Sequence, residues 1–399
     1  MNKTNLIILF FTMVVIMLGF GIIIPIMPFY VEQYGARGTE LGMLMAVFSI
    51  MQFLFAPLWG SLSDRYGRKR ILMIGALGNA LSHLIFGFAT NLGMMFLSRI
   101  LAGILSSATF PTAMAFISDS TDERSRGGGM GIIGASFGVG MVLGPGLGGW
   151  LGGQSLSTPF FLASGLSLAA TILIWLILPE SLPKEKRQPT GGKLRGPQLG
   201  VMWRSLFGPI GFLLLLAFLV NYGLANFEGI FGLYAKYRYS FGPKQVGTVL
   251  TVVGLLSALI QGFLTGPAIQ KLGEERLIKI SLFASALGFV FMVIAQSSLV
   301  YLVVSFFVIS NTMLRPSIAS LVSKRAEGGQ GMALGMSSSF ESLGRVVGPL
   351  WAGALFDVNI NAPYISAAAI MLVVFSLSVF KMRTLVPMKE VPLPGPAAE

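Results

Sequence analysis

Hydrophobic runs of roughly 20 residues, separated by short polar segments, follow one another along almost the whole chain. As an α-helix, a run of this length crosses the hydrocarbon core of a bilayer, which is about 30 Å thick. The pattern therefore predicts about twelve membrane-spanning helices. They are expected near residues 5–29, 41–60, 71–90, 94–117, 129–152, 159–179, 208–231, 245–265, 276–296, 299–322, 331–355 and 363–382. The first run is too long for the core of a signal peptide, so we expect it to be retained.

The longest polar interruption lies between the sixth and seventh runs and divides the chain into two halves. It is rich in Pro, Gly, Lys and Arg, a composition typical of flexible linkers. We expect an N-terminal half of residues 1–179, a cytoplasmic linker of 180–206 and a C-terminal half of 207–383. The proline-rich end, 384–399, is expected to form a disordered cytoplasmic tail.

The second half repeats landmarks of the first half. Gly60, Asp64, Gly67 and Pro111 correspond to Gly266, Gln270, Gly273 and Pro316. The displacement is about 205 residues at each position, which predicts that one six-helix unit has been duplicated.

Composition places the chain in a membrane. Hydrophobic residues make up 54% and charged residues 11% of the chain, and the mean hydropathy is +0.77, as in polytopic membrane proteins. The chain has no cysteine and one histidine, His83, which excludes disulfides and zinc or haem sites. The net charge of +12 comes from basic residues in short loops, so nucleic acid is not an expected partner. Their distribution predicts that both termini are cytoplasmic.

A polar hairpin between the second and third runs reads GSLSDRYGRKR and contains Gly60, Asp64, Arg65, Gly67 and Arg68. The glycines allow a tight reversal, and Asp64 can pair with Arg68 or with the N-terminus of a neighbouring helix. We interpret this pairing as a charge latch that holds one conformation closed. Asp119 and the charged run at 122–126 are candidate partners on the same side. The alternative is a basic loop that only fixes topology.

The most glycine-rich stretch, GIIGASFGVGMVLGPGLGG, runs from Gly131 to Gly149 and is otherwise almost wholly apolar. On a helix its glycines fall on two faces. One face holds Gly140, Gly144 and Gly148, and the other holds Gly131 and Gly149. Small residues on two faces let two neighbouring helices approach closely, and Pro145 favours a bend. A weaker copy of the pattern occurs at 335–353. The stretch is expected to be a moving contact between helices or, alternatively, an ordinary packing seam.

Both segments resemble signatures of the major facilitator superfamily of transporters. The hairpin resembles the loop signature GxLxDRxGRKR, and the glycine-rich stretch resembles the antiporter signature Gx8Gx3GPx2GG at Gly131, Gly140, Gly144, Pro145, Gly148 and Gly149. Parts of the N-terminal half look like bacterial tetracycline exporters, and GLANFEGIFGLY and RPSIASLVSKRAEGGQG look like Gram-positive multidrug pumps of the NorA and Bmr kind. The resemblance implies an all-α membrane protein with the twelve-helix major-facilitator fold, which exchanges drugs for protons by rocking of its halves.

Ionisable residues well inside the predicted spans are the main functional candidates, because burying a charge in lipid is costly. They are Arg99, Glu228, Arg315, Glu341 and Arg345. Glu228 is our first choice for proton coupling, because apolar surroundings favour the protonated form of a carboxyl group. It also matches an acidic residue of the multidrug pumps that bears on drug binding. The alternative is a side chain that extends to the outer interface near Lys236 and Arg238.

Polar and aromatic residues expected near the substrate path are candidates for drug contact. They are Gln52, Asn221, Asn226, Phe227, Glu228 and Asn311. For Gln52, a hydrogen bond between helices is an equal alternative. Asn311 stands where the multidrug pumps carry an aspartate, and because asparagine does not titrate, Glu341 is a candidate substitute.

Glu341 and Arg345 lie four residues apart, in the order that favours an ion pair within a helix. A paired carboxylate stays ionised, so a structural or gating pair is favoured slightly over a proton site. Arg99 matches the arginine of the family's fourth helix and is a candidate for steering proton release by its charge. Its alternative is a structural hydrogen bond to neighbouring carbonyl groups.

These features predict a proton-coupled antiporter of the bacterial plasma membrane that exports amphipathic or cationic drugs. It is expected to act as a monomer among membrane lipids, driven by the proton gradient and without a cofactor. A tetracycline-selective exporter is the main alternative, and a membrane sensor or assembly partner that transports nothing is another. An enzyme is not expected, because the sequence holds no nucleophile, metal or cofactor constellation.

Overall fold

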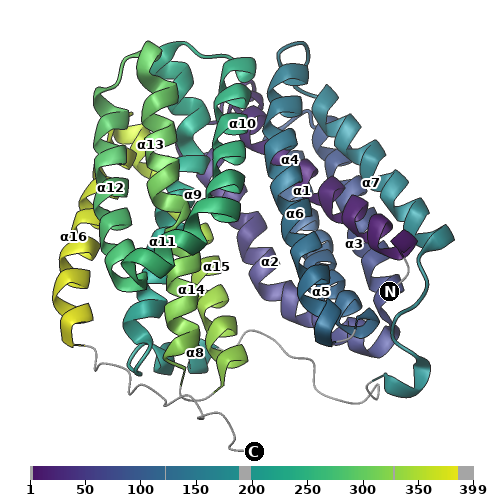
Figure 1. Cartoon of the computed structure of the whole chain (residues 1–399). Helices are drawn as coiled ribbons and strands as arrows, with labels where there is room; N and C mark the ends of the chain where they lie inside the picture. Colours follow the sequence, from purple (N-terminus) through teal and green to yellow (C-terminus); the bar gives the residue numbers. More distant parts are fainter. Residues whose placement is uncertain (1–2, 122, 188–198, 327–328, 385–399) are drawn as a thin grey trace, which may run out of the picture.

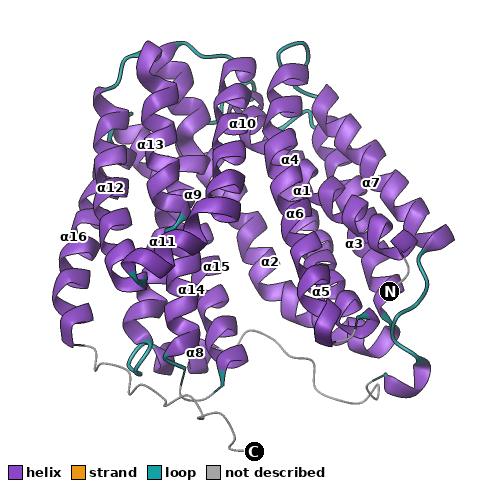
Figure 2. Ribbon diagram, viewed as in Figure 1, coloured by secondary structure: helices purple, strands orange, loops and turns teal. Residues whose placement is uncertain are grey.

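The computed structural model describes residues 3–121, 123–187, 199–326 and 329–384. Every regular element in these ranges is a helix, as Figure 2 shows, so the predicted all-α class is confirmed. Residues 188–198 of the predicted linker and 385–399 of the predicted tail lie outside the described residues.

The N-terminal half is built from long helices joined by short loops. They are α1 (Lys3–Glu32), α2 (Gly38–Tyr66), α3 (Arg68–Gly87), α4 (Leu92–Leu105), η1 (Ser106–Ala108), α5 (Thr109–Ser120), α6 (Glu123–Gly152) and α7 (Thr158–Ile177). The short 3-10 turn η1 joins α4 and α5 into one continuous span.

The C-terminal half follows after two short helices, η2 (Lys184–Lys186) and α8 (Leu199–Ser205). Its helices are α9 (Gly211–Tyr239), α10 (Pro243–Leu259), η3 (Ile260–Leu264), α11 (Thr265–Leu272), α12 (Glu274–Ile294), η4 (Ser297–Leu299), α13 (Val300–Thr312), α14 (Leu314–Lys324), α15 (Gln330–Val358) and α16 (Ala362–Thr384). The π-helical turn η3 joins α10 and α11 into one span.

Eleven segments of the described chain are long and apolar enough to cross a membrane. The remaining predicted span, α15, is 29 residues long but rich in Gly and Ser, and it carries Glu341 and Arg345. It packs against α9 and α2, so its polar face is covered by protein. Polar residues are tolerated in a membrane helix where neighbouring helices shield them from lipid.

The helices gather in two groups, with α1–α7 in one half of the molecule and α9–α16 in the other (Figure 1). Contacts in the two halves follow the same plan. The helix α6 packs on α1 of its own half and on α10 of the other half, and α15 packs on α9 of its own half and on α2 of the other. In each half one long helix, α6 or α15, therefore packs both within its own half and against a helix of the other half.

The halves meet at one end of the molecule, termed here the closed end. It consists of the last turns of α1, α6, α9 and α15 and the first turns of α2 and α10. Glycines bring helix backbones together there: a Cβ added at Gly149 would lie 2.7 Å from the Cα of Gly247, and one at Gly353 would lie 2.7 Å from the carbonyl carbon of Gly38. Larger residues would separate the two halves.

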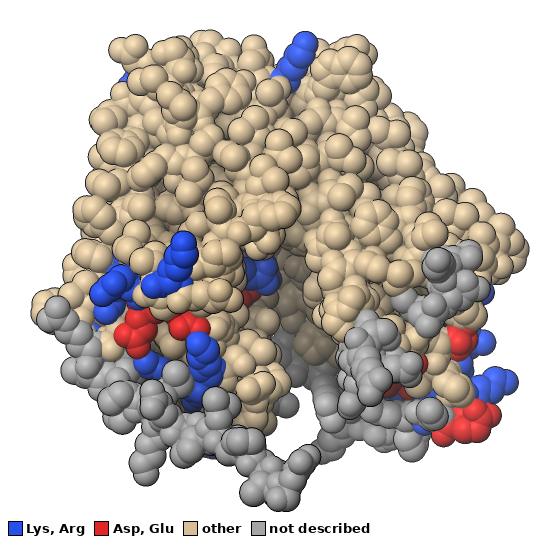
Figure 3. Space-filling model, viewed as in Figure 1, with Lys and Arg blue, Asp and Glu red and all other residues tan. Residues whose placement is uncertain are grey.

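The opposite end, termed the open end, is hollowed. Figure 3 shows a cleft between the two halves that widens toward this end, and charged side chains gather around it. The junction of α2 with α3 and that of α11 with α12 lie here. The fold thus presents a path that is closed on one side and open on the other.

Candidate functional site

The hairpin between α2 and α3 is organised around the guanidinium group of Arg68. Its Nη1 lies 2.6 Å from Oδ1 of Asp64, and its Nε lies 2.9 Å from Oδ2 of Asp119 on α5. Gly67 turns the chain with a φ of 99°, a conformation that residues with a side chain rarely adopt. The backbone N–H of Arg68 donates to Oε1 of Glu180 at 2.7 Å. The predicted pairing of Asp64 and Asp119 with Arg68 is confirmed, and these contacts stay inside the N-terminal half.

Gly60 and Arg65, the other members of the predicted latch, lie half-buried near the end of α2. The charged run at 122–126 was a further candidate partner. Asp122 lies outside the described residues, as do the side chains of the four residues after it. Their role in the latch therefore stays a prediction.

The junction of α11 with α12 is the counterpart of this hairpin in the C-terminal half, and it carries the opposite charges. Glu274 begins α12, in the position that Arg68 holds at the start of α3, and its carboxylate bonds the ammonium group of Lys324 on α14. Lys324 takes the position of Asp119 in the repeat, since both pairs are related by about 205 residues. The sequence comparison of the two halves used Gly60, Asp64, Gly67 and Pro111. It did not identify this ion pair, in which the acidic and basic positions are exchanged.

Three glycines of the predicted antiporter stretch, Gly140, Gly144 and Gly148, face α1 of the same half. A Cβ at Gly144 would lie 2.8 Å from the Cα of Gly21, and one at Gly148 would lie 2.7 Å from the carbonyl oxygen of Ile22. The shared helical face that the spacing predicts is therefore a close backbone contact.

The other face of α6 crosses to α10 of the opposite half. Gly149 meets Gly247, and the carbonyl oxygen of Pro145 lies 2.5 Å from the place of a Cβ on Gly247. Among the described residues, no atom lies within 4 Å of a Cβ added at Gly131. Gly131 matches the signature in sequence but makes neither of these helix contacts.

Four ionisable residues of the C-terminal half form a charged cluster: Glu228, Arg315, Glu341 and Arg345. Glu341 is 5% exposed, and its Oε2 lies 2.9 Å from both Nε and Nη2 of Arg315 on α14. Arg345 donates to the hydroxyl of Ser342 at 3.0 Å, and its charge acts on the other three members of the cluster. The direct partner of Glu341 is thus Arg315. The ion pair with Arg345 that the four-residue spacing within α15 predicts is wrong.

Glu228 lies in the middle of α9, which packs against helices of both halves. Between Val220 and Ala235, only Leu224 and Glu228 are not buried. They lie one helical turn apart, so this stripe faces the cleft between the halves. Among the described residues, no hydrogen bond or ion pair reaches the Glu228 carboxylate. The charged group that acts on this carboxylate is the guanidinium of Arg345.

The residues predicted to contact drug lie at different depths. Gln52 on α2 is half-buried. Asn221 and Asn311 are 6% and 4% exposed, and Asn226 and Phe227 have no exposed surface. The ring of Phe227 packs against two phenylalanine rings with centroids 5.0 and 5.1 Å away. In this conformation these four residues pack inside the C-terminal half, and only Gln52 and Glu228 of the predicted set are partly exposed.

Arg99 on α4 is 3% exposed and reaches toward α2. Its Nε donates to the carbonyl oxygen of Leu44 at 3.3 Å, and its guanidinium lies 4.4 Å from the centroid of the Phe48 ring. Within the described part of the chain, no carboxylate pairs with it. These contacts favour the structural alternative, and a role in proton release stays a prediction.

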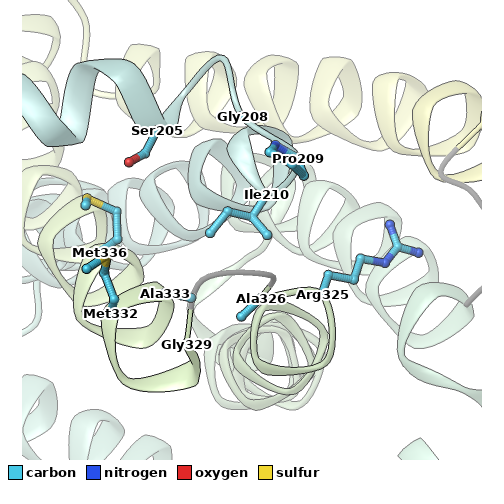
Figure 4. Close-up of a pocket in the computed structure, with 10 residues that line it drawn as sticks. All are labelled: Ser205, Gly208, Pro209, Ile210, Arg325, Ala326, Gly329, Met332, Ala333 and Met336. Atoms are coloured by element: carbon cyan, nitrogen blue, oxygen red, sulfur yellow. The ribbon is translucent and has the colours of Figure 1, made fainter. Parts of the chain in front are cut away.

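A separate cavity of about 190 Å³ lies in the C-terminal half, between the turn from α8 to α9 and the junction of α14 with α15. Figure 4 shows Met332 and Met336 on one side of it and the guanidinium of Arg325 directed away from them. None of the residues predicted to bind drug lines this cavity. The cleft between the halves, and not this cavity, is therefore the candidate site.

Comparison with known proteins gives an independent result. The family model of the Major Facilitator Superfamily matches residues 9–242 and 213–398. Multidrug resistance protein 2 of Bacillus subtilis (strain 168) is 34% identical over 379 residues, which cover 94% of this chain and 95% of that protein. Quinolone resistance protein NorA of Staphylococcus aureus (strain MRSA252) is 34% identical over 375 residues, which cover 93% and 95%.

Solved structures show the same fold. A crystal structure of the nucleoside transporter NupG superposes with a TM-score of 0.75 at 16% identity, over 98% of this chain and 100% of that chain. The human organic anion transporter MFSD10 gives a TM-score of 0.67 at 22% identity, over 94% and 99%. The two-half fold of these solved structures agrees with the sequence relationships, which cover nearly the whole of this chain. This chain is a multi-pass membrane protein and belongs to the Major Facilitator Superfamily.

Proposed function

We propose that the chain is a proton-coupled antiporter that exports amphipathic and cationic drugs across the bacterial plasma membrane by alternating access. Relatives named multidrug resistance protein 2 and quinolone resistance protein NorA support the substrate class. Two packed halves with a cleft open at one end support the transport cycle. The protein works as a monomer among membrane lipids, and the proton gradient drives it without a cofactor.

The orientation in the membrane follows from the basic residues. Those of the hairpin, including Arg68, and those of the opposite corner, including Lys324, lie at the open end. Cytoplasmic loops carry an excess of Lys and Arg, so the open end and both termini face the cytoplasm. In this conformation the cleft accepts a drug from inside the cell.

The observation that carries the proposal is the unpartnered carboxylate of Glu228 at the cleft. The Glu341 carboxylate accepts hydrogen bonds from two nitrogens of Arg315, so it already has a charged partner in direct contact. Glu228 has no such donor among the described residues, and only the charge of Arg345 acts on it. Glu228 is therefore the acid whose proton is exchanged, and Arg345 stabilises its ionised form.

Coupling requires that proton and drug disfavour each other at Glu228. With the cleft open to the cytoplasm, the ionised carboxylate attracts a cationic drug. After the halves rock outward, a proton from outside neutralises the carboxylate and the drug leaves. The protonated protein then returns to the conformation described here and releases its proton inside.

The gradient supplies enough free energy for this exchange. One elementary charge crossing 100 mV contributes about 2.3 kcal/mol, and one pH unit contributes about 1.4 kcal/mol. For an uncharged drug their sum corresponds to a gradient of several hundredfold per proton when coupling is tight. Exchange of a monovalent cationic drug for one proton moves no net charge, so only the pH difference drives it, by about tenfold per pH unit.

Glu228→Gln tests the assignment in proteoliposomes that carry a pH-sensitive dye inside. We expect drug-induced proton movement and export of a cationic dye to fall at least about tenfold, because the variant cannot release a proton. Glu341→Gln is the matched control, since it removes the other carboxyl group of the cluster, and proton movement per exported drug should persist in it. Proton-driven export by Glu228→Gln at the wild-type rate would show that the assignment is wrong.

A further inference from the structure

Asp357, in the last turn of α15, reaches across the closed end to the first turn of α2 in the other half. Its Oδ1 accepts a hydrogen bond from the backbone N–H of Gly38 at 2.9 Å. Its Oδ2 accepts one from the N–H of Thr39 at 2.9 Å and another from the Thr39 hydroxyl. One carboxylate thus binds three donors of the opposite half.

The chemistry of a helix N-terminus explains why this contact is strong. The first N–H groups of a helix have no partner within the helix, and the helix dipole favours a negative charge beside them. The nearby acid on α2 itself, Glu40, bonds the N–H of Arg37 and not those of Gly38 and Thr39. The acceptor for these two groups comes from α15. Asp357 therefore caps α2 only while the two halves are in contact.

The repeat shows that this contact is specific to one of the two crossings. Position 357 corresponds to Gly153 after α6, and Gly38 corresponds to Pro243 at the start of α10. Gly153 has no side chain, and Pro243 has no N–H to donate. The crossing of α6 with α10 therefore lacks this charged cap, whereas the crossing of α15 with α2 has it.

We propose that Asp357 is a positioning residue of the transport cycle that holds the closed end shut and must release α2 whenever this end opens. The proposal rests on the proposed function in taking the closed end as the outward one. Around it, Glu32 bonds Lys236 and Tyr237 across the same end. Removal of the Asp357 cap shifts the population toward molecules with the closed end separated.

The test measures the distance across the closed end. The chain has no cysteine, so spin labels at Gln154→Cys and Ser297→Cys, on loops of opposite halves, report only this separation. We expect Asp357→Asn to raise the ratio of separated to closed molecules about tenfold, which equals about 1.4 kcal/mol. Glu40→Gln is the matched control, because it removes a carboxylate at the same end that bonds within its own loop, and its distance distribution should match wild type.

Thr39→Val provides a second variant in case Asp357→Asn fails to fold. It removes one of the three donors and should shift the distribution in the same direction by a smaller factor. An unchanged distribution in both variants would overturn the proposal. The distance measurement involves neither drug nor proton, so it stands or falls independently of Glu228. Export by Asp357→Asn should also slow several-fold at unchanged protein level, because closure of this end precedes opening of the other.

Discussion

Glu341 and Glu228 are both carboxylates of the C-terminal half, but their surroundings differ. Glu341 is 5% exposed and accepts from two nitrogens of Arg315 at 2.9 Å. Glu228 lies at the cleft, where the charge of Arg345 acts on it from a neighbouring helix. A carboxylate with two charge-assisted hydrogen bonds loses both of them if its partner moves away, whereas one that is only near a charge has no such direct contact to lose.

Arg315→Ala should destabilise the protein by about 1–3 kcal/mol, because it removes both hydrogen-bond donors of the buried Glu341 carboxylate. Unfolding in mixed micelles measures this loss. The double variant Arg315→Ala with Glu341→Gln should recover much of it, since the buried carboxylate that lost its donors is then replaced by a neutral amide. Equal stability of wild type and the single variant would mean that the pair contributes nothing.

At the residue scale, sequence identified the right ionisable residues but not all of their partners. The spacing of Glu341 and Arg345 favours a pair within α15, but the structure brings Arg315 of α14 to the carboxylate. Which side chain of another helix arrives at a given position depends on packing between helices, which spacing along one helix does not contain. Asp64 and Arg68 were predictable because they are neighbours in the chain as well as in space.

The helix α6 serves two contacts at once because its glycines occupy two faces. Gly140, Gly144 and Gly148 admit α1 of the same half, and Gly149 admits α10 of the other half. The helix α15 repeats the arrangement with α9 and α2. Each of these helices therefore contacts a helix of its own half on one face and a helix of the other half on another face.

Gly144→Leu should abolish transport while leaving the protein in the membrane. The added side chain meets the backbone of α1 at 2.8 Å, and overpacking of this kind costs about 1–3 kcal/mol. Gly131→Leu is the matched control, because the space around Gly131 is empty, and its transport should equal wild type. Transport rates and membrane levels of both variants check this, and normal export by Gly144→Leu would make the contact an ordinary packing seam.

At the element scale, the hydrophobic runs located the helices well, because a span of fixed length is imposed by the bilayer. The sequence does not predict which face of α9 lies toward the cleft, since the helix is apolar on most faces. Asn226 and Phe227 stand beside Glu228 in sequence but have no exposed surface. In a central helix with neighbours on nearly every side, polarity does not mark which face the cleft touches.

The two ends of the molecule differ: glycine contacts and the Asp357 cap lie at one end, and a cleft lies between the halves at the other (Figure 3). The duplicated halves make equivalent crossings, but their polar corners differ. Arg68 pairs with Asp119 in one half, and Glu274 pairs with Lys324 in the other. The repeat thus preserves backbone geometry more strictly than charge.

Leu224→Cys tests whether the cleft is accessible only from the cytoplasmic side of the membrane. Leu224 is partly exposed one turn from Glu228, and the chain has no other thiol. A membrane-impermeant thiol reagent should label it at least about tenfold faster from the cytoplasmic side, in proportion to the population open there. Gln154→Cys, on the loop after α6 at the closed end, is the control and should label faster from outside. Equal labelling of Leu224→Cys from both sides would contradict the orientation.

Sequence predicted the two-half architecture because duplication leaves landmarks such as Gly67 and Gly273, whose positive φ angles of 99° and 74° are structural requirements. The conformation was not predictable. The sequence does not say which arrangement of the two halves the chain adopts, and the contact of Asp357 with α2 depends on that arrangement.

The glycine crossings of the closed end have a genetic consequence. Every missense change of a glycine codon adds atoms, and at Gly38, Gly42, Gly149, Gly247 and Gly353 those atoms would meet the backbone of another helix. No amino-acid replacement is conservative at such positions, whereas hydrophobic residues in contact with lipid exchange for one another at little cost. We therefore expect substitutions at the closed-end glycines to impair closure, whereas the walls of the cleft are where a replacement can change which compounds fit while the contact between the halves is kept.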